Sequence, residues 1–369
     1  MIIGDNAETM KKLLKNIGAA WICSLLLTVP TTGSAKAVWP QQGVPEHSEA
    51  QAKVKITGPR LLFSDSPETV YATGILYRDT LQGEGRLFFH HVNGTDTPKQ
   101  LAVLFKNKGL RPATITVTRS GIDGPGLDYQ AVGKKSQEYY FGEQKPYTKT
   151  LTFGQSTELL SGSGMLLPTD LLLTGTIDFV SDRPVEVTVL MCDPRNDIEL
   201  FAEQASQLPQ DEHPLRGTFK KSDLNYKVRK TVNTDSGKIY ALAMAEGGTG
   251  EYLRGTDVTT GLPAENYGNY GVVYNVDYKL KGDRPYELWL NPWGGMFAGV
   301  GVLEQGGERK LINLPDVDAF GRVGEEGFCI ATLAPNSKGR FTWSPPPASN
   351  LPIRLFWMPA DYRAPHLRD

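Results

Sequence analysis

The chain has 369 residues, with 39 Lys and Arg against 41 Asp and Glu, so its formal net charge is -2. Hydrophobic residues make up 40% and charged residues 22%, which excludes a disordered chain, a coiled coil and a polycationic nucleic-acid binder. With 39 Gly and 25 Pro, turns must be frequent.

The N-terminal region has the three-part pattern of a secretory signal peptide. A basic patch at Lys11, Lys12 and Lys15 precedes an apolar run over residues 17–29, and Ala35-Lys36-Ala37 fits a small-x-small cleavage site. The run is shorter than the ~20 residues of a membrane span. A buried N-terminal helix is the alternative interpretation. We predict a signal peptide over residues 1–37, no transmembrane segment, and a protein that is secreted, either extracellular or associated with the cell wall.

The rest of the chain is dominated by alternation with a period of two, which predicts strands with one buried face. It occurs over residues 114–118, 185–191, 272–280 and 353–357. Turn signals separate these runs, among them Asn93-Gly94, Ser181-Asp182-Arg183-Pro184 and Lys281-Gly282-Asp283.

Two segments favour helices instead. Residues 128–141 place Tyr129, Val132, Tyr139 and Tyr140 near one face. Residues 196–208 have apolar spacings of three and four, preceded by Asp193-Pro194 as a cap and first-turn proline.

We therefore predict a mainly β fold with two antiparallel β-sandwich domains, Ig-like or jelly-roll-like, and one or two short helices. The expected divisions are a flexible leader over 38–52, a first sandwich with a helical insertion over 53–205, a linker over 206–213 and a second sandwich over 214–369. Either sandwich is long enough to bury a core without disulfides. Cys192 and Cys329 form a disulfide or stay free; free thiols are the simpler interpretation.

Several reactive chemistries lack their motifs. His90 and His91 are neighbours in a strand and face opposite sides, so they cannot chelate one metal together. There is no His-Glu-x-x-His, Cys-x-x-Cys, Gly-x-Ser-x-Gly or Walker-type loop. We assign no catalytic residue, no metal ligand and no cofactor.

Carboxylates leave one catalytic alternative open, because distance along the chain says nothing about distance in space. A pair suited to glycoside hydrolysis would come from Glu84, Asp128, Asp277, Glu287 and Glu325. The acidic stretches 193–197 and 316–318 lack regular calcium-loop spacing, so we interpret them as turns and helix caps.

An aromatic, amide-rich stretch over 264–271 and a downstream Trp-rich stretch over 289–295 are the most distinctive features. Aromatic rings beside amides and carboxylates suit sugar faces, whereas the alternative is a turn followed by core packing. The candidate ligand-binding residues are Glu265, Asn266, Tyr267, Asn269, Tyr270 and Trp293.

Four stretches of the chain resemble a known group: 60–68, 74–80, 86–95 and 128–134. Together they resemble exported proteins of Gram-positive-type, spore-forming bacteria, some of which carry a copper-amine-oxidase-like label. That label implies a copper site of three His and a Tyr converted to a quinone within an Asn-Tyr-Asp/Glu motif. Here Gly follows both Asn266-Tyr267 and Asn269-Tyr270, so no catalytic residue is carried over.

The sequence favours a cell-envelope protein that acts by non-covalent binding or as a structural component, with a cell-surface polysaccharide or an envelope protein as candidate partner. One alternative is a glycan-active hydrolase with a carboxylate pair. Another is an oligomerising surface or appendage subunit. Nucleic acid is not expected as a partner, because the acidic balance would repel phosphates.

Overall fold

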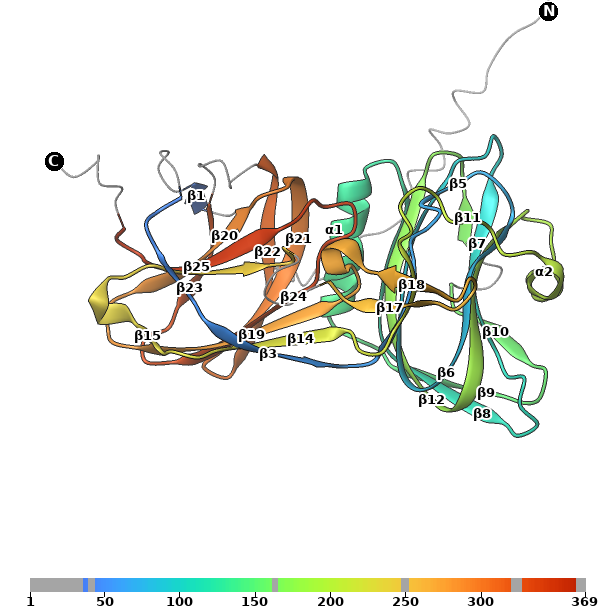
Figure 1. Cartoon of the computed structure of the whole chain (residues 1–369), viewed down its shortest axis with the longest axis horizontal. Coiled ribbons are helices and arrows are strands. Elements are labelled where there is room, and N and C mark those ends of the chain that lie inside the picture. Colours follow the sequence, from blue (N-terminus) through green and yellow to red (C-terminus); the bar gives the residue numbers. More distant parts are fainter. Residues whose placement is uncertain (1–35, 39–43, 161–164, 247–251, 320–326, 363–369) are drawn as a thin grey trace, which may run out of the picture. The chain divides into compact units, whose positions relative to one another are not determined.

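Strands dominate the computed structural model, which describes residues 36–38, 44–160, 165–246, 252–319 and 327–362 (Figure 1). The predicted signal peptide lies outside the described residues except for its last two positions. No helix in the described ranges has the length and apolar character to cross a membrane. The predicted mainly β fold is confirmed, with three sheets arranged as two sandwiches.

A twelve-stranded sheet forms the first sandwich. Its strands are β4 (Arg60–Ser64), β5 (Thr69–Val70), β6 (Gly74–Asn93), β7 (Lys99–Lys106), β8 (Ala113–Gly126), β9 (Tyr147–Leu151), β10 (Ser156–Glu158), β11 (Met165–Leu167), β12 (Leu172–Cys192), β13 (Arg216–Phe219), β17 (Arg254–Asp257) and β18 (Leu262–Glu265).

One long strand pair explains how a single sheet encloses a core. β12 pairs with β6 along almost its whole length, while its first half also pairs with β8 and its second half with β7. The register shifts between Ser181 and Val185, so the stretch that we predicted as a turn is instead an irregularity within β12. Bulges bend strands, and the two halves fold over a core that includes Val185, Val187 and Val189.

Two facing sheets form the second sandwich. The six-stranded sheet has β1 (Lys36–Val38), β23 (Phe328–Leu333), β20 (Tyr286–Pro292), β25 (Ile353–Pro359), β16 (Tyr240–Met244) and β2 (Ser48–Glu49). The seven-stranded sheet has β22 (Glu308–Ala319), β21 (Gly295–Gln305), β24 (Lys338–Trp343), β19 (Val273–Lys281), β14 (Asp223–Val228) and β3 (Ala52–Thr57), with β15 (Val232–Asn233) beside β19. Aromatic pairs fill the core between them, with ring centroids 5.2 Å apart for Tyr274 and Trp343 and 5.7 Å apart for Tyr278 and Trp357.

Strand pairing crosses the predicted domain boundaries. β3, which precedes the first sandwich in the chain, pairs with β14 of the second, and β13, which follows the expected linker, pairs with β4 of the first. In the expected leader, β2 pairs with β16 and Ala50 is buried. In the expected linker, the Gln207 amide donates to the carbonyls of Ile75 and Leu76. These segments are thus built into the sandwiches.

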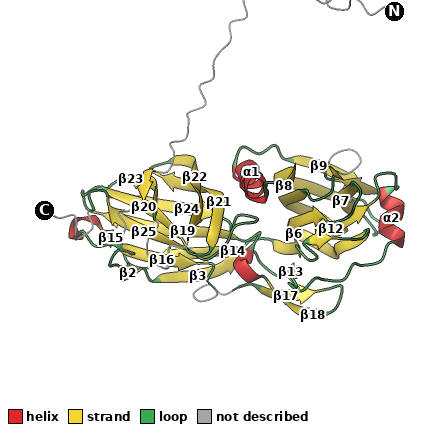
Figure 2. Ribbon diagram, turned by 90° about the horizontal axis from the view of Figure 1, so that it is seen from above, coloured by secondary structure: helices red, strands yellow, loops and turns green. Residues whose placement is uncertain are grey.

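The two α-helices lie where the sequence predicted them (Figure 2). α1 (Tyr129–Phe141) begins at Asp128, whose carboxylate accepts from the Ala131 amide, and it contacts both β8 and β21. Its buried face includes Val132 and Tyr140 but not Tyr139, which is half exposed.

α2 (Ile198–Gln204) packs on β12. Its capping residue is Asp197, so the predicted cap at Asp193-Pro194 is wrong. Two 3-10 turns, η1 (Thr234–Ser236) and η2 (Tyr267–Asn269), complete the described helices. Cys192 is a buried free thiol, and Cys329 is half-buried.

Candidate functional site

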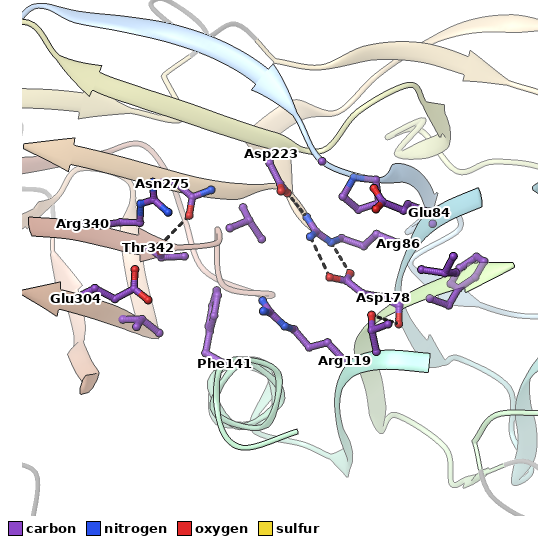
Figure 3. A pocket seen from close by; sticks show the side chains of 18 of the residues that line it. Glu84, Arg86, Arg119, Phe141, Asp178, Asp223, Asn275, Glu304, Arg340 and Thr342 are labelled. Atoms are coloured by element: carbon purple, nitrogen blue, oxygen red, sulfur yellow. Dashed lines mark hydrogen bonds and ion pairs between the residues drawn. The ribbon is translucent and has the colours of Figure 1, made fainter. Parts of the chain in front are cut away.

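A charged pocket of about 460 Å³ is lined by strands of both sandwiches (Figure 3). Its lining includes Glu84, Arg86, Arg119, Asp178, Asp223, Glu304, Arg309 and Arg340. Four guanidinium groups and four carboxylates therefore surround one cavity. Cavities of this size are typical of small-molecule sites.

Arg86 of β6 is the structural centre of this charged pocket. It is 2% exposed, and it donates to both carboxylate oxygens of Asp178, at 2.7 and 3.2 Å, and to Asp223 Oδ1 at 2.9 Å. It also donates to the carbonyl oxygens of Ser222 and Gly271, both at 3.2 Å. Bidentate geometry and several acceptors are what a buried guanidinium needs.

The sheet register brings these groups together. Arg86 and Asp178 are direct partners across the β6–β12 pair, and Asp223 begins β14. Gly58 allows the approach of Asp223, because a Cβ at position 58 would lie 2.3 Å from the Asp223 carboxyl carbon. Gly58 also has a φ of +81°, which disfavours other residues.

Arg86, Asp178, Asp223 and Tyr140 form what we call the Arg86 cluster. Burial and neighbouring charges shift the pKa values in this cluster in opposite directions. Burial alone would lower the pKa of the Arg86 guanidinium, but Asp178, Tyr140 and Asp223 outweigh it, so the pKa lies well above the ordinary value. Burial raises the pKa of the Asp223 carboxyl, although Arg86 pulls it down. The Tyr140 hydroxyl donates to Asp178 Oδ2 at 2.8 Å and completes the network.

Of the other charged side chains in the pocket, Arg340 pairs with Asp277 at 2.7 Å, but four have no such ion pair among the described residues. The Arg119 side chain reaches from β8 into the pocket (Figure 3), and its guanidinium lies 5.0 Å from the centroid of the Tyr140 ring. Arg309 donates to the Phe141 carbonyl at 2.6 Å. Among the described residues, neither arginine forms an ion pair, and the same holds for Glu84 and Glu304. Donors and acceptors on these four side chains remain able to contact a ligand.

The predicted binding residues have separate local roles. Asn266 and Asn269 are fully buried: the Asn266 amide donates to the Tyr270 carbonyl, and Asn269 accepts from the Leu253 amide and donates to the Tyr274 hydroxyl at 2.8 Å. The exposed Tyr267 packs edge-on against Tyr252.

The remaining three predicted residues also have specific neighbours. Tyr270 donates to the Ser349 carbonyl at 2.8 Å. Trp293 lies under the Arg354 guanidinium and donates to Asn291, while Glu265 pairs with Arg254 at 3.5 Å. Whether they bind a ligand stays a prediction.

The residues do not fit the copper centre implied by the resemblance. His90 donates from Nδ1 to Thr174, and both ring nitrogens of His91 have partners, Ser64 and the Pro67 carbonyl. Burial lowers the pKa of His90 to about 3 and that of His91 to about 4. Within the described ranges no three or more His, Cys, Asp or Glu gather as metal ligands would.

The carboxylates proposed for hydrolysis lie in different surroundings. Glu84 lines the charged pocket, Asp128 caps α1, Asp277 pairs with Arg340, and Glu287 accepts from Trp289. Glu325 lies outside the described residues.

Sequence reasoning missed the Arg86 cluster. Its signal was a charged residue at the start of the apolar run 87–89, opposite a charged residue in another long strand. The partners are 92 and 137 positions away in the chain, so only the register connects them.

Comparisons with known proteins give no family. No family model matches the chain, and no curated protein matches it. Among solved structures, a mutant of Bacillus subtilis oxalate decarboxylase aligns at 10% identity over 84% of this chain and 79% of that chain, with a TM-score of 0.13. A formate complex of Lactobacillus farciminis oxalate decarboxylase aligns at 9% identity over 84% and 88%, with a TM-score of 0.13. Salicylate dioxygenase from Pseudaminobacter salicylatoxidans aligns at 10% identity over 76% and 69%, again with a TM-score of 0.13. Scores this low carry no argument about fold or function.

Proposed function

We propose that this protein is a non-covalent binding protein whose charged pocket takes a hydroxyl-rich ligand of the saccharide class. One observation carries the proposal. Arg119, Arg309, Glu84 and Glu304 line a single cavity without forming ion pairs among the described residues, whereas Arg86 is tied to two carboxylates. The pocket thus offers charged donors and charged acceptors around the same space.

This mixture matches the chemistry of sugar hydroxyls. Each hydroxyl donates one hydrogen bond and accepts others, so it can contact a carboxylate and a guanidinium at the same time. Hydrogen bonds to ionised groups are stronger than those between neutral groups. A ligand with a large net charge would meet repulsion from one half of the lining, whereas a neutral polyol would not.

The base of the charged pocket is rigid, which favours selective binding of one ligand shape. The Arg86 cluster holds β6, β12 and β14 together beneath the pocket through hydrogen bonds of 2.7 to 3.2 Å. Sites supported by locked side chains keep their geometry when the ligand arrives. Binding, which needs only such a preformed site, is therefore a simpler function than hydrolysis by a carboxylate pair.

The place of action is part of the proposal. The N-terminal pattern over residues 1–37 supports export, and we infer that the mature protein acts outside the cytoplasm at the cell envelope. A cell-surface polysaccharide is then the partner whose chemistry fits the pocket best. The alternative of an oligomerising surface subunit predicts self-association of the purified protein instead.

The experiment is affinity electrophoresis or co-sedimentation of the mature chain with cellulose, chitin, peptidoglycan and teichoic-acid-free cell wall, followed by calorimetry with the matching oligosaccharide. The decisive variant is R119A, and R195A is the matched control because Arg195 is exposed in the turn before α2. We expect R119A to weaken binding at least about tenfold, since it removes a charged hydrogen-bond donor, while R195A binds like the wild type. Equal binding by R119A, or no binding to any of the polysaccharides, would overturn the proposal. Release of reducing sugar would favour the hydrolase.

A further inference from the structure

A second cavity, of about 500 Å³, shares no lining residue with the charged pocket and has an acidic and aromatic lining. Its walls come from the β4–β5 connection, β6, the first turn of α1, β21 and the loop over 347–350. The lining includes Asp65, Glu68, Phe88, His90, Asp128, Gln130, Tyr270 and Met296. None of the described residues that line it is Lys or Arg.

Asp65 is the exceptional group in this cavity. Its side chain is buried, with the residue 6% exposed, yet its Oδ1 atom has no hydrogen-bond partner among the described residues. A buried acceptor without a partner is costly in a folded protein, so native structures rarely keep one without a reason. The Gln130 Nε2 donor, in the same lining, also lacks a partner.

Further negative charge surrounds Asp65. Glu68 stands at the rim, and Asp211 lies behind the connection, where it accepts from the Ser66 hydroxyl and the Glu68 amide at 2.8 Å each. Burial, Glu68 and Asp211 together raise the pKa of Asp65 well above its ordinary value. The Arg216 guanidinium, which reaches the Ser66 carbonyl at 3.4 Å, is bound to the Asp257 carboxylate and to further backbone carbonyls.

His90 adds an acceptor rather than a charge. Thr174 donates its own hydroxyl hydrogen to the Phe89 carbonyl, so it accepts from His90 Nδ1, and this fixes the ring hydrogen on Nδ1. Because the imidazole stays neutral at pH 7, its Nε2 atom carries a lone pair. Phe88 and Tyr270, with ring centroids 6.5 Å apart, supply aromatic surface, and the half-exposed Met296 lies at the mouth.

We propose that this second cavity binds an organic ammonium ion, with the cationic nitrogen beside Asp65 and Glu68 and the apolar body against Phe88, Tyr270 and Met296. A cation supplies the partner that Asp65 Oδ1 lacks, and it balances Asp65 and Glu68, neither of which forms an ion pair with Lys or Arg among the described residues. Aromatic faces attract ammonium ions in addition. A hydrogen-bond acceptor on the ligand body would supply the partner that the Gln130 Nε2 donor lacks among the described residues. This inference is independent of the saccharide proposal, because the Arg86 cluster takes no part in it.

The test is isothermal titration calorimetry on the mature chain with phenethylamine, and with phenylpropanoate as the probe of similar shape and opposite charge. We expect saturable binding of the amine only. D65N and E68Q should each weaken it about tenfold or more, because each removes a negative charge from a poorly solvated site. D96N is the matched control, since Asp96 is exposed on another turn, and it should bind like the wild type.

Two further readouts keep the proposal falsifiable. D65N preserves the shape of the side chain and Oδ1 has no partner to lose, while Glu68 is exposed, so E68Q tests the charge without touching the interior. R119A should leave amine binding unchanged. Absence of saturable amine binding, equal binding of phenylpropanoate, unchanged affinity in both D65N and E68Q, or loss of amine binding in R119A would each overturn the assignment.

Discussion

Removal of the Arg86 guanidinium should destabilise the whole chain, because this one side chain joins three strands from two sandwiches. In R86L the Asp178 and Asp223 carboxylates, whose side chains are 17% and 22% exposed, would face each other without their cation. Breaking a buried ion pair by removing one partner costs about 3–5 kcal/mol. Since domains are stable by only about 5–15 kcal/mol, the loss is a large fraction of the total.

The assay is urea unfolding followed by tryptophan fluorescence, for which the buried Trp343 and Trp357 serve as probes. R119L is the matched control, because Arg119 lines the same pocket without an ion pair among the described residues; its free energy of unfolding should stay within about 1 kcal/mol of the wild type. R86K keeps the charge but not the bidentate contact, so its stability should fall between R86L and the wild type.

The pH dependence of the R86L deficit follows from the Asp223 pKa. This pKa is already raised by burial, and loss of Arg86 raises it further. A raised carboxyl pKa means that the folded state binds a proton more readily than the unfolded state, so the penalty is present at neutral pH and shrinks as the pH falls. The deficit of R86L should thus be largest at pH 7 and smaller at pH 5. A free energy of unfolding for R86L that lies within about 1 kcal/mol of the wild-type value at pH 7 would refute this reasoning.

Three further outcomes can be measured on the same material. G133A should lower the melting temperature, although alanine favours helices by about 1 kcal/mol over glycine, because its Cβ would lie 2.2 Å from the Pro347 carbonyl oxygen; an unchanged or higher melting temperature would show that α1 packs differently. D65N should raise stability at pH 7 in the absence of ligand, because burial raises the pKa of the Asp65 carboxyl in the folded state. The gain should shrink as the pH falls from 7 and be absent below about pH 4, where this carboxyl is protonated in the folded and the unfolded state alike. A constant gain from pH 7 to below about pH 4 would contradict burial as the cause. Thiol titration of the native protein should modify Cys329 faster than Cys192, whose pKa is raised by burial to about 11, and a non-reducing peptide map should find no bridge between them.

The alternation of apolar and polar residues with a period of two correctly predicted many strands. The run over 272–280 became β19, whose buried residues alternate as expected, and the run over 185–191 became the second half of β12. Helix α1 could also be predicted, because its apolar residues recur at helical spacing, and the structure adds Asp128 as its cap. In these segments the local pattern and the tertiary packing agree.

The predicted strand ends and pairings fail where tertiary contacts override local signals. Ser181-Asp182-Arg183-Pro184 has the composition of a turn, yet β12 continues through it because β6 and β8 pair with it on both sides. The Arg86 cluster was invisible for a related reason: its importance comes from partners that only the register brings near. The Asn residues at 266 and 269 show the reverse, since their buried amides stabilise the turn that the sequence offered as a ligand site.

The most direct test of the binding function is a crystal structure of the mature chain in complex with the oligosaccharide that binds best in calorimetry. We expect sugar hydroxyls within hydrogen-bond distance of the Arg119 guanidinium and of Glu84 or Glu304, with the Arg86 contacts to Asp178 and Asp223 unchanged. Sugar density on another face of the molecule, with the charged pocket filled only by water, would contradict the assignment of the pocket as the binding site.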